Sequence, residues 1–310
     1  MHRIDVHHHL FPPAFVAGLV DSGHYLSRGI AKSWTPRVSI EDMDAAGVAT
    51  AYTSITAPGF DVVAQERRVA ATRECNEYGA RMAADHPGRF GLFASLPLPD
   101  VDASLKELAY SLDVLKADGI GLLTSYRDKW LGDPAFAPVM DELDRRKAVV
   151  YVHPTTPDCC RNLMDGIADW VVEFPVDTTR TIASLLFSGT VARCRNIRFI
   201  FAHLGGILPL VASHLERAAE VDASLRKKAG GDIAAMLKAF HYDTALRANP
   251  GALKAALELI GVPQILFGTD APLRRSRDQL HGLLEHGFSA QDLRRIECDN
   301  ALALLSRRAS

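Results

Sequence analysis

The sequence has little of what marks secreted, membrane-spanning or nucleic-acid-binding proteins. Five cysteines among 310 residues are an odd number without a regular framework, so we expect reduced thiols in a cytoplasmic protein. We find neither an N-terminal apolar signal segment nor an apolar run of the roughly 18 residues that a membrane span needs. The formal net charge is −2, without a long basic face, which argues against nucleic acid. A small molecule is the expected partner.

Aromatic residues are also scarce, at 7 %, although 48 % of the residues are hydrophobic. This balance suits the aliphatic core of parallel strands covered by helices. Strand-like runs alternate with helical patterns close to eight times, as in parallel βα units. The expected strands are residues 3–6, 49–53, 90–95, 120–123, 148–152, 197–202, 240–244 and 264–267.

An open doubly wound nucleotide-binding sheet is the alternative to a barrel. It would normally carry a Gly-x-Gly-x-x-Gly run after an early strand, and this chain has none. The sequence therefore predicts an α/β fold, a single (β/α)8 TIM barrel over residues 1–310. Residues 10–38 lack a βα pattern and are rich in Gly, Pro and Ser, so we expect a small insertion after strand 1 over the barrel mouth. The next helix is expected to start at Ser39 as N-cap, with Asp42 as its capping-box acid.

Three consecutive histidines, His7, His8 and His9, follow the first strand-like run. Residues i and i+2 of a strand share a face, so the side chains of His7 and His9 should project together while His8 points away. A remnant of an expression tag is the alternative explanation. It is disfavoured because tags are usually longer and lie outside the fold, whereas these residues lie between a strand and the Leu10–Pro13 segment. The pair supplies half of a metal site.

Polar residues stand where several of the other strands end. His153 follows strand five, His203 follows strand six and Asp270 follows strand eight. Functional residues of such barrels lie at these carboxyl ends, so the histidines and the acid should converge on a metal centre. Zinc suits three imidazoles and a carboxylate, and the same ligands accept manganese or iron. Strand four, Ile120–Thr124, has no lysine that could bridge two metals, which favours one ion.

These motifs resemble the amidohydrolase superfamily, in particular its branch of nonoxidative decarboxylases similar to aminocarboxymuconate-semialdehyde decarboxylase. The resemblance covers nearly the whole chain, and the bacterial homologues placed nearest resemble 6-methylsalicylate decarboxylases. It implies that zinc is bound by His7, His9, His153 and Asp270. It also implies that His203 is a base or proton relay rather than a ligand, and that the protein is a homodimer. The motifs that carry it are His7-x-His9, His153, Phe201–Pro209, Phe267–Asp270, Trp170–Val172 and Pro175–Thr179.

The chain also departs from the family pattern. Members that act on the dicarboxylate semialdehyde have arginines at the positions of Ser39 and His214. Arg37 and Arg217 lie close enough in sequence to replace them as substrate-binding residues, but a substrate with one carboxylate is the simpler inference. Members that act on resorcylate-like acids have a glutamate where this chain has Gly206.

The predicted activity is metal-dependent nonoxidative decarboxylation of a small hydroxylated aromatic, salicylate-like acid or a related unsaturated acid, without an organic cofactor. Asp270 or His203 would supply the proton to the ring carbon, and Trp170 and Phe174 would stack on the ring. Asp243, at the end of strand seven, is either an orienter of a histidine or an ordinary cap. Two other functions stay open: a hydrolase of a lactone, ester or amide on the same scaffold, and a metal-binding protein without catalysis.

Overall fold

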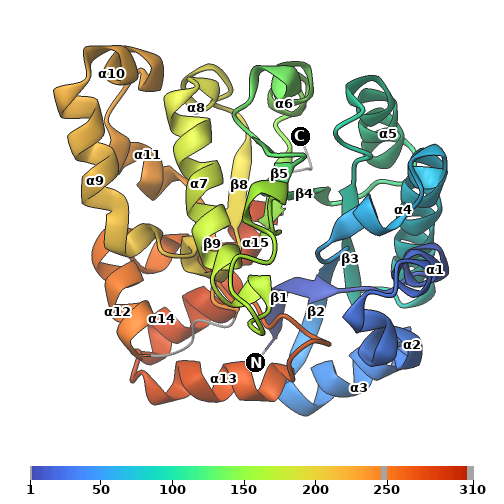
Figure 1. Cartoon of the computed structure of the whole chain (residues 1–310). Helices are drawn as coiled ribbons and strands as arrows, with labels where there is room; N and C mark the ends of the chain where they lie inside the picture. The colour runs from blue at the N-terminus through green and yellow to red at the C-terminus, as the bar shows by residue number, and fades with distance from the viewer. Residues whose placement is uncertain (1, 246–249, 306–310) are drawn as a thin grey trace.

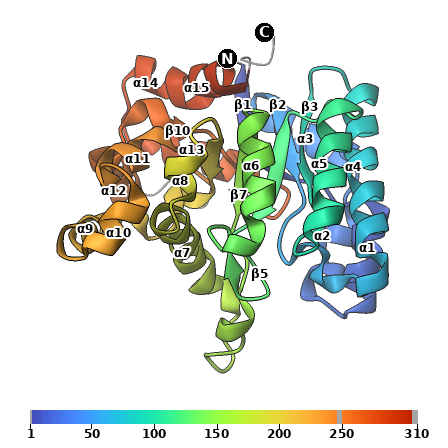
Figure 2. The same cartoon turned by 90° about the horizontal axis from the view of Figure 1, so that it is seen from above.

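The computed structural model describes residues 2–245 and 250–305, so residues 1, 246–249 and 306–310 of the predicted single unit lie outside it. Within the described part, eight parallel strands pair in the order β1-β2-β3-β4-β7-β8-β9-β10. Helices surround them (Figures 1 and 2). The strands are β1 (Arg3–His9), β2 (Val48–Ser54), β3 (Phe90–Ser95), β4 (Gly119–Leu123), β7 (Val149–His153), β8 (Arg198–Phe201), β9 (His241–Asp243) and β10 (Ile265–Leu266).

Backbone hydrogen bonds between the two ends of the chain close the barrel. The Val6 N–H donates to the carbonyl of Phe267 at 3.0 Å, and the Asp270 N–H donates to the carbonyl of His7 at 2.9 Å. The last strand and the segment after it therefore lie beside β1. The predicted (β/α)8 barrel is confirmed.

The helices differ more from the sequence-based expectations than the strands do. The described residues form fifteen α-helices, more than the eight that one helix per βα unit would give. Between β4 and α6, a short antiparallel hairpin is formed by β5 (Ser125–Tyr126) and β6 (Lys129–Trp130). The α-helices are α1 (Pro13–Asp21), α2 (Ile30–Ser33), α3 (Pro36–Ala46), α4 (Arg68–Asp85), α5 (Val101–Asp113), α6 (Ala137–Arg145), α7 (Glu173–Phe187), α8 (Thr190–Arg193), α9 (Leu208–Val221), α10 (Ala223–Ala229), α11 (Ile233–Ala239), α12 (Pro250–Leu259), α13 (Ser276–Glu285), α14 (Ala290–Arg294) and α15 (Asn300–Leu305).

The segment after β1, residues 10–38, is largely helical rather than irregular. The predicted start of the next helix was wrong, because α3 begins at Pro36 and Thr35 is its N-cap, with its hydroxyl accepting the Val38 N–H at 3.3 Å. Proline is well suited to the first helical position, where its missing N–H costs nothing. Ser39 is instead buried and accepts a hydrogen bond from the Trp34 indole at 2.9 Å.

The barrel interior is filled at the amino ends of the strands. Rings of Tyr52, Phe93 and Tyr151 stack in succession, with centroids 5.5 Å apart in each pair. Ala301 and Leu304 of α15 belong to the same buried cluster as Ile4 and Val6 of β1 and cover this end. Because side chains occupy this end, the barrel can open to a ligand only at the carboxyl ends of the strands. No helix in the described ranges combines the length and the apolar character needed to cross a membrane.

Candidate active site

Four buried side chains converge at the carboxyl ends of the strands. His7 and His9 come from β1, His153 ends β7, and Asp270 follows β10. One donor atom from each lies within 4.8 Å of the others. The Nε2 atoms of His7 and His9 are 3.1 Å apart, and they lie 3.2 and 3.0 Å from Oδ1 of Asp270. The structure thus brings together the four residues that the sequence suggested as metal ligands.

The alternation of the strand separates His8 from its neighbours. Its Nε2 lies 2.8 Å from the hydroxyl of Ser39, and its Nδ1 lies 3.1 Å from a carboxylate oxygen of Asp5. His8 therefore ties β1 to α3. It takes no part in the cluster of His7 and His9.

Each histidine of the cluster is held by its other ring nitrogen. Nδ1 of His7 lies 3.0 Å from Oδ2 of Asp243, and Nδ1 of His9 lies 3.2 Å from the carbonyl of Ser54. Nδ1 of His153 lies 2.8 Å from the carbonyl of Pro154. An acceptor at Nδ1 favours the proton there and leaves Nε2 as a lone-pair donor, as in most histidine metal sites. Of the two roles expected for Asp243, the contact with a histidine is present, and its other oxygen also accepts the Ala245 N–H, as a cap would.

The electrostatics of the cluster favour a cation. Burial alone would lower the pKa of His7, but the carboxylates of Asp243 and Asp270 raise it to about 10. Burial likewise opposes ionisation of Asp270, yet His7 and His9 hold its pKa well below the ordinary value. Burial and the neighbouring histidines keep the pKa of His153 well below its ordinary value. The ionised carboxylate of Asp270 and the neutral imidazole of His153 are ligands that one divalent ion would use, and such an ion would take the place of the proton held on His7.

Glycine at position 268 allows the close approach of His7 and Asp243. A Cβ at this position would lie 2.8 Å from the Cβ of Asp243 and 2.9 Å from the Cβ of His7. Such distances are too short for real side chains, so any other residue would push the two apart. In the Phe267-Gly268-x-Asp270 run, Gly268 thus permits the close packing of His7 and Asp243, and Asp270 is a member of the four-residue cluster.

His203 lies beside the cluster rather than within it. Its ring centroid is 5.0 Å from that of His7 and 5.9 Å from that of His153, and the residue is buried. It has a φ of 57° and Asp270 has a φ of 67°, values uncommon outside glycine. Strained backbone of this kind persists where the surroundings hold it, often at functional sites. After His203, a Cβ at Gly206 would come 2.0 Å from the carbonyl oxygen of Pro175, so the turn needs glycine to pack on α7.

A cavity of about 290 Å³ opens above the cluster. This volume is at the small end for ligand pockets, which start at about 300 Å³. The predicted ring-binding residues Trp170 and Phe174 line it, and the ring of Phe174 stands perpendicular to that of His153 at 6.0 Å. Its apolar lining is Leu26, Ala57, Trp170, Phe174 and Leu273, and its polar lining is Tyr25, Thr56, His153, His203, Asp270 and Arg274.

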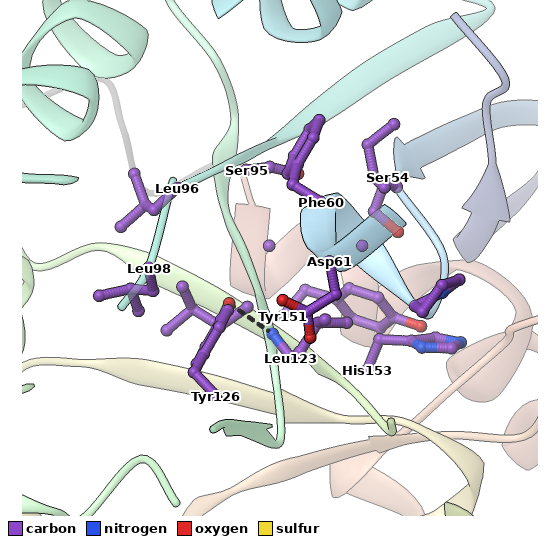
Figure 3. A pocket seen from close by; sticks show the side chains of 15 residues that line it. Ser54, Phe60, Asp61, Ser95, Leu96, Leu98, Leu123, Tyr126, Tyr151 and His153 are labelled. Carbon is purple, nitrogen blue, oxygen red and sulfur yellow. Dashed lines mark hydrogen bonds between the residues drawn. The ribbon is translucent and has the colours of Figure 1, made fainter. Parts of the chain in front are cut away.

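A second, smaller cavity of about 30 Å³ lies against His153, among residues of β2, β3, β4 and β7 (Figure 3). The hydroxyls of Ser54 and Tyr151 border it, and both are buried without a hydrogen-bond partner in the described part of the chain. The space holds about one water molecule, which such hydroxyls require. It is too small for an aromatic acid, so the larger cavity is the candidate substrate pocket.

Two predicted substrate-binding arginines do not reach this pocket. The Arg37 side chain is 87 % exposed and pairs with Glu41 at 2.7 Å, and the Arg217 side chain is 70 % exposed and pairs with Glu220 at 2.9 Å. Neither residue lines the cavity. Each arginine lies in a helix and pairs with an acid one turn further along it. The expectation that Arg37 and Arg217 bind the substrate, which rested on their distance in sequence from positions 39 and 214, is therefore corrected.

Sequence reasoning missed Arg274 and Tyr25, which do line the cavity. Arg274 stands four residues after Asp270, in the loop after the last strand. Its place after a strand end was a usable signal, because such loops form the open face of the barrel. Tyr25 belongs to the segment over residues 10–38, which was expected to lie at the mouth but carried no motif.

Comparison with known proteins gives a consistent result. A family model described as Amidohydrolase matches residues 4–307. The chain is 37 % identical over 327 aligned residues to Decarboxylase yanB of Aspergillus niger, with 99 % of this chain and 88 % of the relative covered. It is 35 % identical to a 6-methylsalicylic acid decarboxylase of Penicillium expansum, with 88 % and 85 % covered. A dihydroxybenzoic acid decarboxylase from Polaromonas, crystallised with manganese and 2-nitroresorcinol, has a similar fold, with a TM-score of 0.88, 21 % identity, and 100 % and 98 % of the chains covered.

Proposed function

The chain belongs to the amidohydrolase family, and on that basis we propose that it is a metal-dependent nonoxidative decarboxylase of a small hydroxylated aromatic acid of the salicylate type. One observation carries the proposal: His7, His9, His153 and Asp270 converge, and two of them, His153 and Asp270, line a cavity of about 290 Å³ together with His203. Relatives that are 35 to 37 % identical and named as decarboxylases support the reaction type.

The proposed metal ligands are His7, His9, His153 and Asp270. A divalent ion bound there would supply electrophilic stabilisation of the oxygen atoms of the substrate. Zinc is our first candidate from the ligand types, and manganese, present in the Polaromonas structure, is the second. The chain itself supplies the orientation, because Asp243, Ser54 and Pro154 each hold one Nδ1.

Decarboxylation needs a proton at the ring carbon that bears the carboxylate. We assign the delivery of this proton to His203, which lines the cavity. Asp270 is the less suitable proton donor, because His7 and His9 hold its pKa well below the ordinary value and it therefore stays ionised, without a proton to deliver. Once the carbon is protonated, the bond to the carboxyl carbon breaks, its electron pair restores the aromatic ring, and carbon dioxide leaves. No organic cofactor is needed to hold the electrons.

The ring of the substrate is proposed to lie against Phe174 and Trp170. Both line the cavity, and Phe174 also contacts His153. Aromatic side chains prefer offset or edge-on contacts with another ring, worth about 0.5 to 1.5 kcal/mol beyond the buried area.

Two further expectations remain predictions. We expect a homodimer, which sedimentation of the purified protein would test, and a cytoplasmic location, which fractionation of cells would test.

The test of the proposed function is a substrate screen with the metal-loaded protein. The zinc and manganese forms are incubated with salicylate, 6-methylsalicylate and 2,6-dihydroxybenzoate, and carbon dioxide and the phenol product are measured. A panel of aryl esters, amides and lactones is run in parallel. Stoichiometric carbon dioxide and phenol, lost after chelation and regained with metal, would support the proposal. Metal-dependent turnover of the ester, amide or lactone panel without any carbon dioxide would replace it with the hydrolase alternative.

A further inference from the structure

Arg274 is the one Arg or Lys side chain among the residues described as lining the larger cavity. In the described part of the chain, its guanidinium forms neither a hydrogen bond nor an ion pair with another side chain. Arg161, by contrast, is paired with Asp158 at 2.9 Å. An arginine that faces a cavity without a protein acceptor is available to an anionic ligand.

Among the described residues that line the same cavity, Asp270 is the only carboxylate, and it is already engaged. Asp270 contacts His7 and His9 at 3.2 and 3.0 Å, and its carboxylate lies within 4.0 Å of no arginine. The positive charge of Arg274 is therefore not balanced by an acidic residue of the pocket. A carboxylate on the ligand would balance it.

The backbone around Arg274 is fixed at both ends. Its N–H donates to the carbonyl of Asp270 at 3.1 Å, and the Asp270 N–H is itself bonded to the carbonyl of His7. Two residues further on, the Ser276 N–H donates to the Asp42 carboxylate at 3.1 Å. The side chain thus starts from a position set by the metal-ligand loop, which limits the conformational entropy lost when it binds an anion.

The rest of the lining defines what else the ligand carries. Leu26, Leu273 and Phe174 offer apolar surface, which suits a flat hydrocarbon body rather than a second charged group. One cation beside an apolar wall matches a ring with a single carboxylate. This agrees with the absence of arginine at positions 39 and 214.

We propose that Arg274 is a specificity-determining residue that binds the carboxylate of an aromatic monocarboxylic acid in this pocket. The inference rests on the proposed function for the choice of ligand class. It goes further by placing the recognition of the carboxylate on the loop after β10 rather than on α3 or α9, where Arg37 and Arg217 lie.

The chemistry predicts which kinetic constant depends on Arg274. The carboxylate loses its charge as carbon dioxide forms, so its contact with the guanidinium is stronger in the bound substrate than in the transition state. An interaction of this kind supports binding and adds nothing to the chemical step. Replacing Arg274 should therefore raise KM and leave kcat the same or higher.

The experiment compares Arg274→Gln and Arg274→Lys with Arg275→Gln, because Arg275 is the next residue, is exposed like Arg274 and does not line the cavity. Binding of salicylate and of phenol to the metal-loaded protein is measured by calorimetric titration. A charged hydrogen bond in a partly exposed pocket is worth about tenfold in affinity. We expect Arg274→Gln to lower the affinity for salicylate by this factor and Arg274→Lys to lower it less. Arg275→Gln should leave this affinity unchanged. Phenol, which lacks the carboxylate, should bind all variants equally.

Unchanged salicylate affinity in Arg274→Gln, an equal loss for phenol, or an equal loss in Arg275→Gln would each overturn the proposal. So would a wild-type protein that binds no aromatic carboxylate. The binding measurement does not depend on turnover. If salicylate binds through Arg274 but no carbon dioxide is released, the proposed function fails while the assignment of Arg274 stands.

Discussion

Asp243 contacts His7 with one carboxylate oxygen and the backbone around His203 with the other. Its Oδ2 lies 3.0 Å from Nδ1 of His7, while its Oδ1 accepts the N–H groups of His203 and Ala245 at 3.1 and 2.9 Å. A single buried side chain of β9 thus positions a proposed metal ligand on β1 and the proposed proton donor after β8. Asp243 therefore links the proposed metal site to the residue proposed to deliver the proton.

Asp243→Asn should weaken metal binding by about 10- to 100-fold, the usual effect of losing such a partner. An amide cannot accept on both sides: either its NH2 group faces Nδ1 of His7, or it faces the N–H groups of His203 and Ala245. The dissociation constant for zinc, measured against a competing chelator, checks this. An affinity equal to that of the wild type would show that Asp243 only supports the backbone.

His7→Asn and His8→Asn form a matched pair of adjacent buried histidines. We expect His7→Asn to lose bound metal, because Nε2 of His7 is part of the cluster. His8→Asn should keep one metal per chain and unfold at a lower temperature, because only its contacts with Asp5 and Ser39 are lost. Metal analysis and thermal unfolding of both variants give the answer, and equal metal loss in the two would contradict the assignment by strand face.

His203→Asn should lower kcat by about 10²- to 10⁴-fold, the range for removal of a positioned proton donor. Metal content and salicylate affinity should stay close to those of the wild type, because His203 lies outside the four-atom cluster. Steady-state kinetics with metal analysis on the same preparation test this. Activity within a few-fold of the wild type would transfer the proton delivery to another group.

Asp177→Ala should destabilise the protein by about 2 to 4 kcal/mol, because three donors lose their acceptor. Asp177 is fully buried on α7 and accepts hydrogen bonds from Thr124, Ser125 and the Trp130 indole, which attaches the β5–β6 hairpin. Urea unfolding followed by fluorescence measures the loss. A change below about 1 kcal/mol would mean that water replaces the carboxylate.

The pKa of Asp177 adds a pH dependence to this loss. Burial raises this pKa, although the hydrogen bonds of Thr124, Trp130 and Ser125 oppose the rise. Since the folded-state pKa lies above the unfolded value, the carboxyl group favours the folded state less as the pH rises through that interval. The difference in unfolding free energy between wild type and Asp177→Ala should therefore grow as the pH falls towards the ordinary carboxyl value of about 4. The opposite trend would contradict the direction of the shift.

The parts of the fold that follow from chain periodicity could be predicted from the sequence. The strand Phe90–Ser95 has the predicted bounds, and the alternation that separates His8 from His7 and His9 is present. The four side chains could be predicted to lie together because each follows the end of a strand. Parallel strands in a barrel present their carboxyl ends on one face, independently of the exact positions of the helices. These features depend on local pattern and topology alone.

The remaining features depend on contacts between distant segments. β1 continues through His9 because its last residues pair with Ser54 and with the segment around Ala271. Arg37 and Arg217 were chosen by their distance in sequence from Ser39 and His214, yet the helix direction turns both into solvent. The position of Arg274 after a strand end was visible in the sequence, but only the closed barrel shows that this residue lines the cavity.

The closure of the barrel also fixes when the site can form during synthesis of the protein. His9 and Asp270 are 261 positions apart, so a growing chain carries His7 and His9 long before their carboxylate partner exists. Contacts of such high sequence separation form late, because the intervening chain must be ordered first. Until the last strand docks beside the first, the two histidines have no acid opposite them. Metal uptake should therefore be a property of the finished chain, and a ribosome-bound fragment that ends before Asp270 should fail to retain the ion.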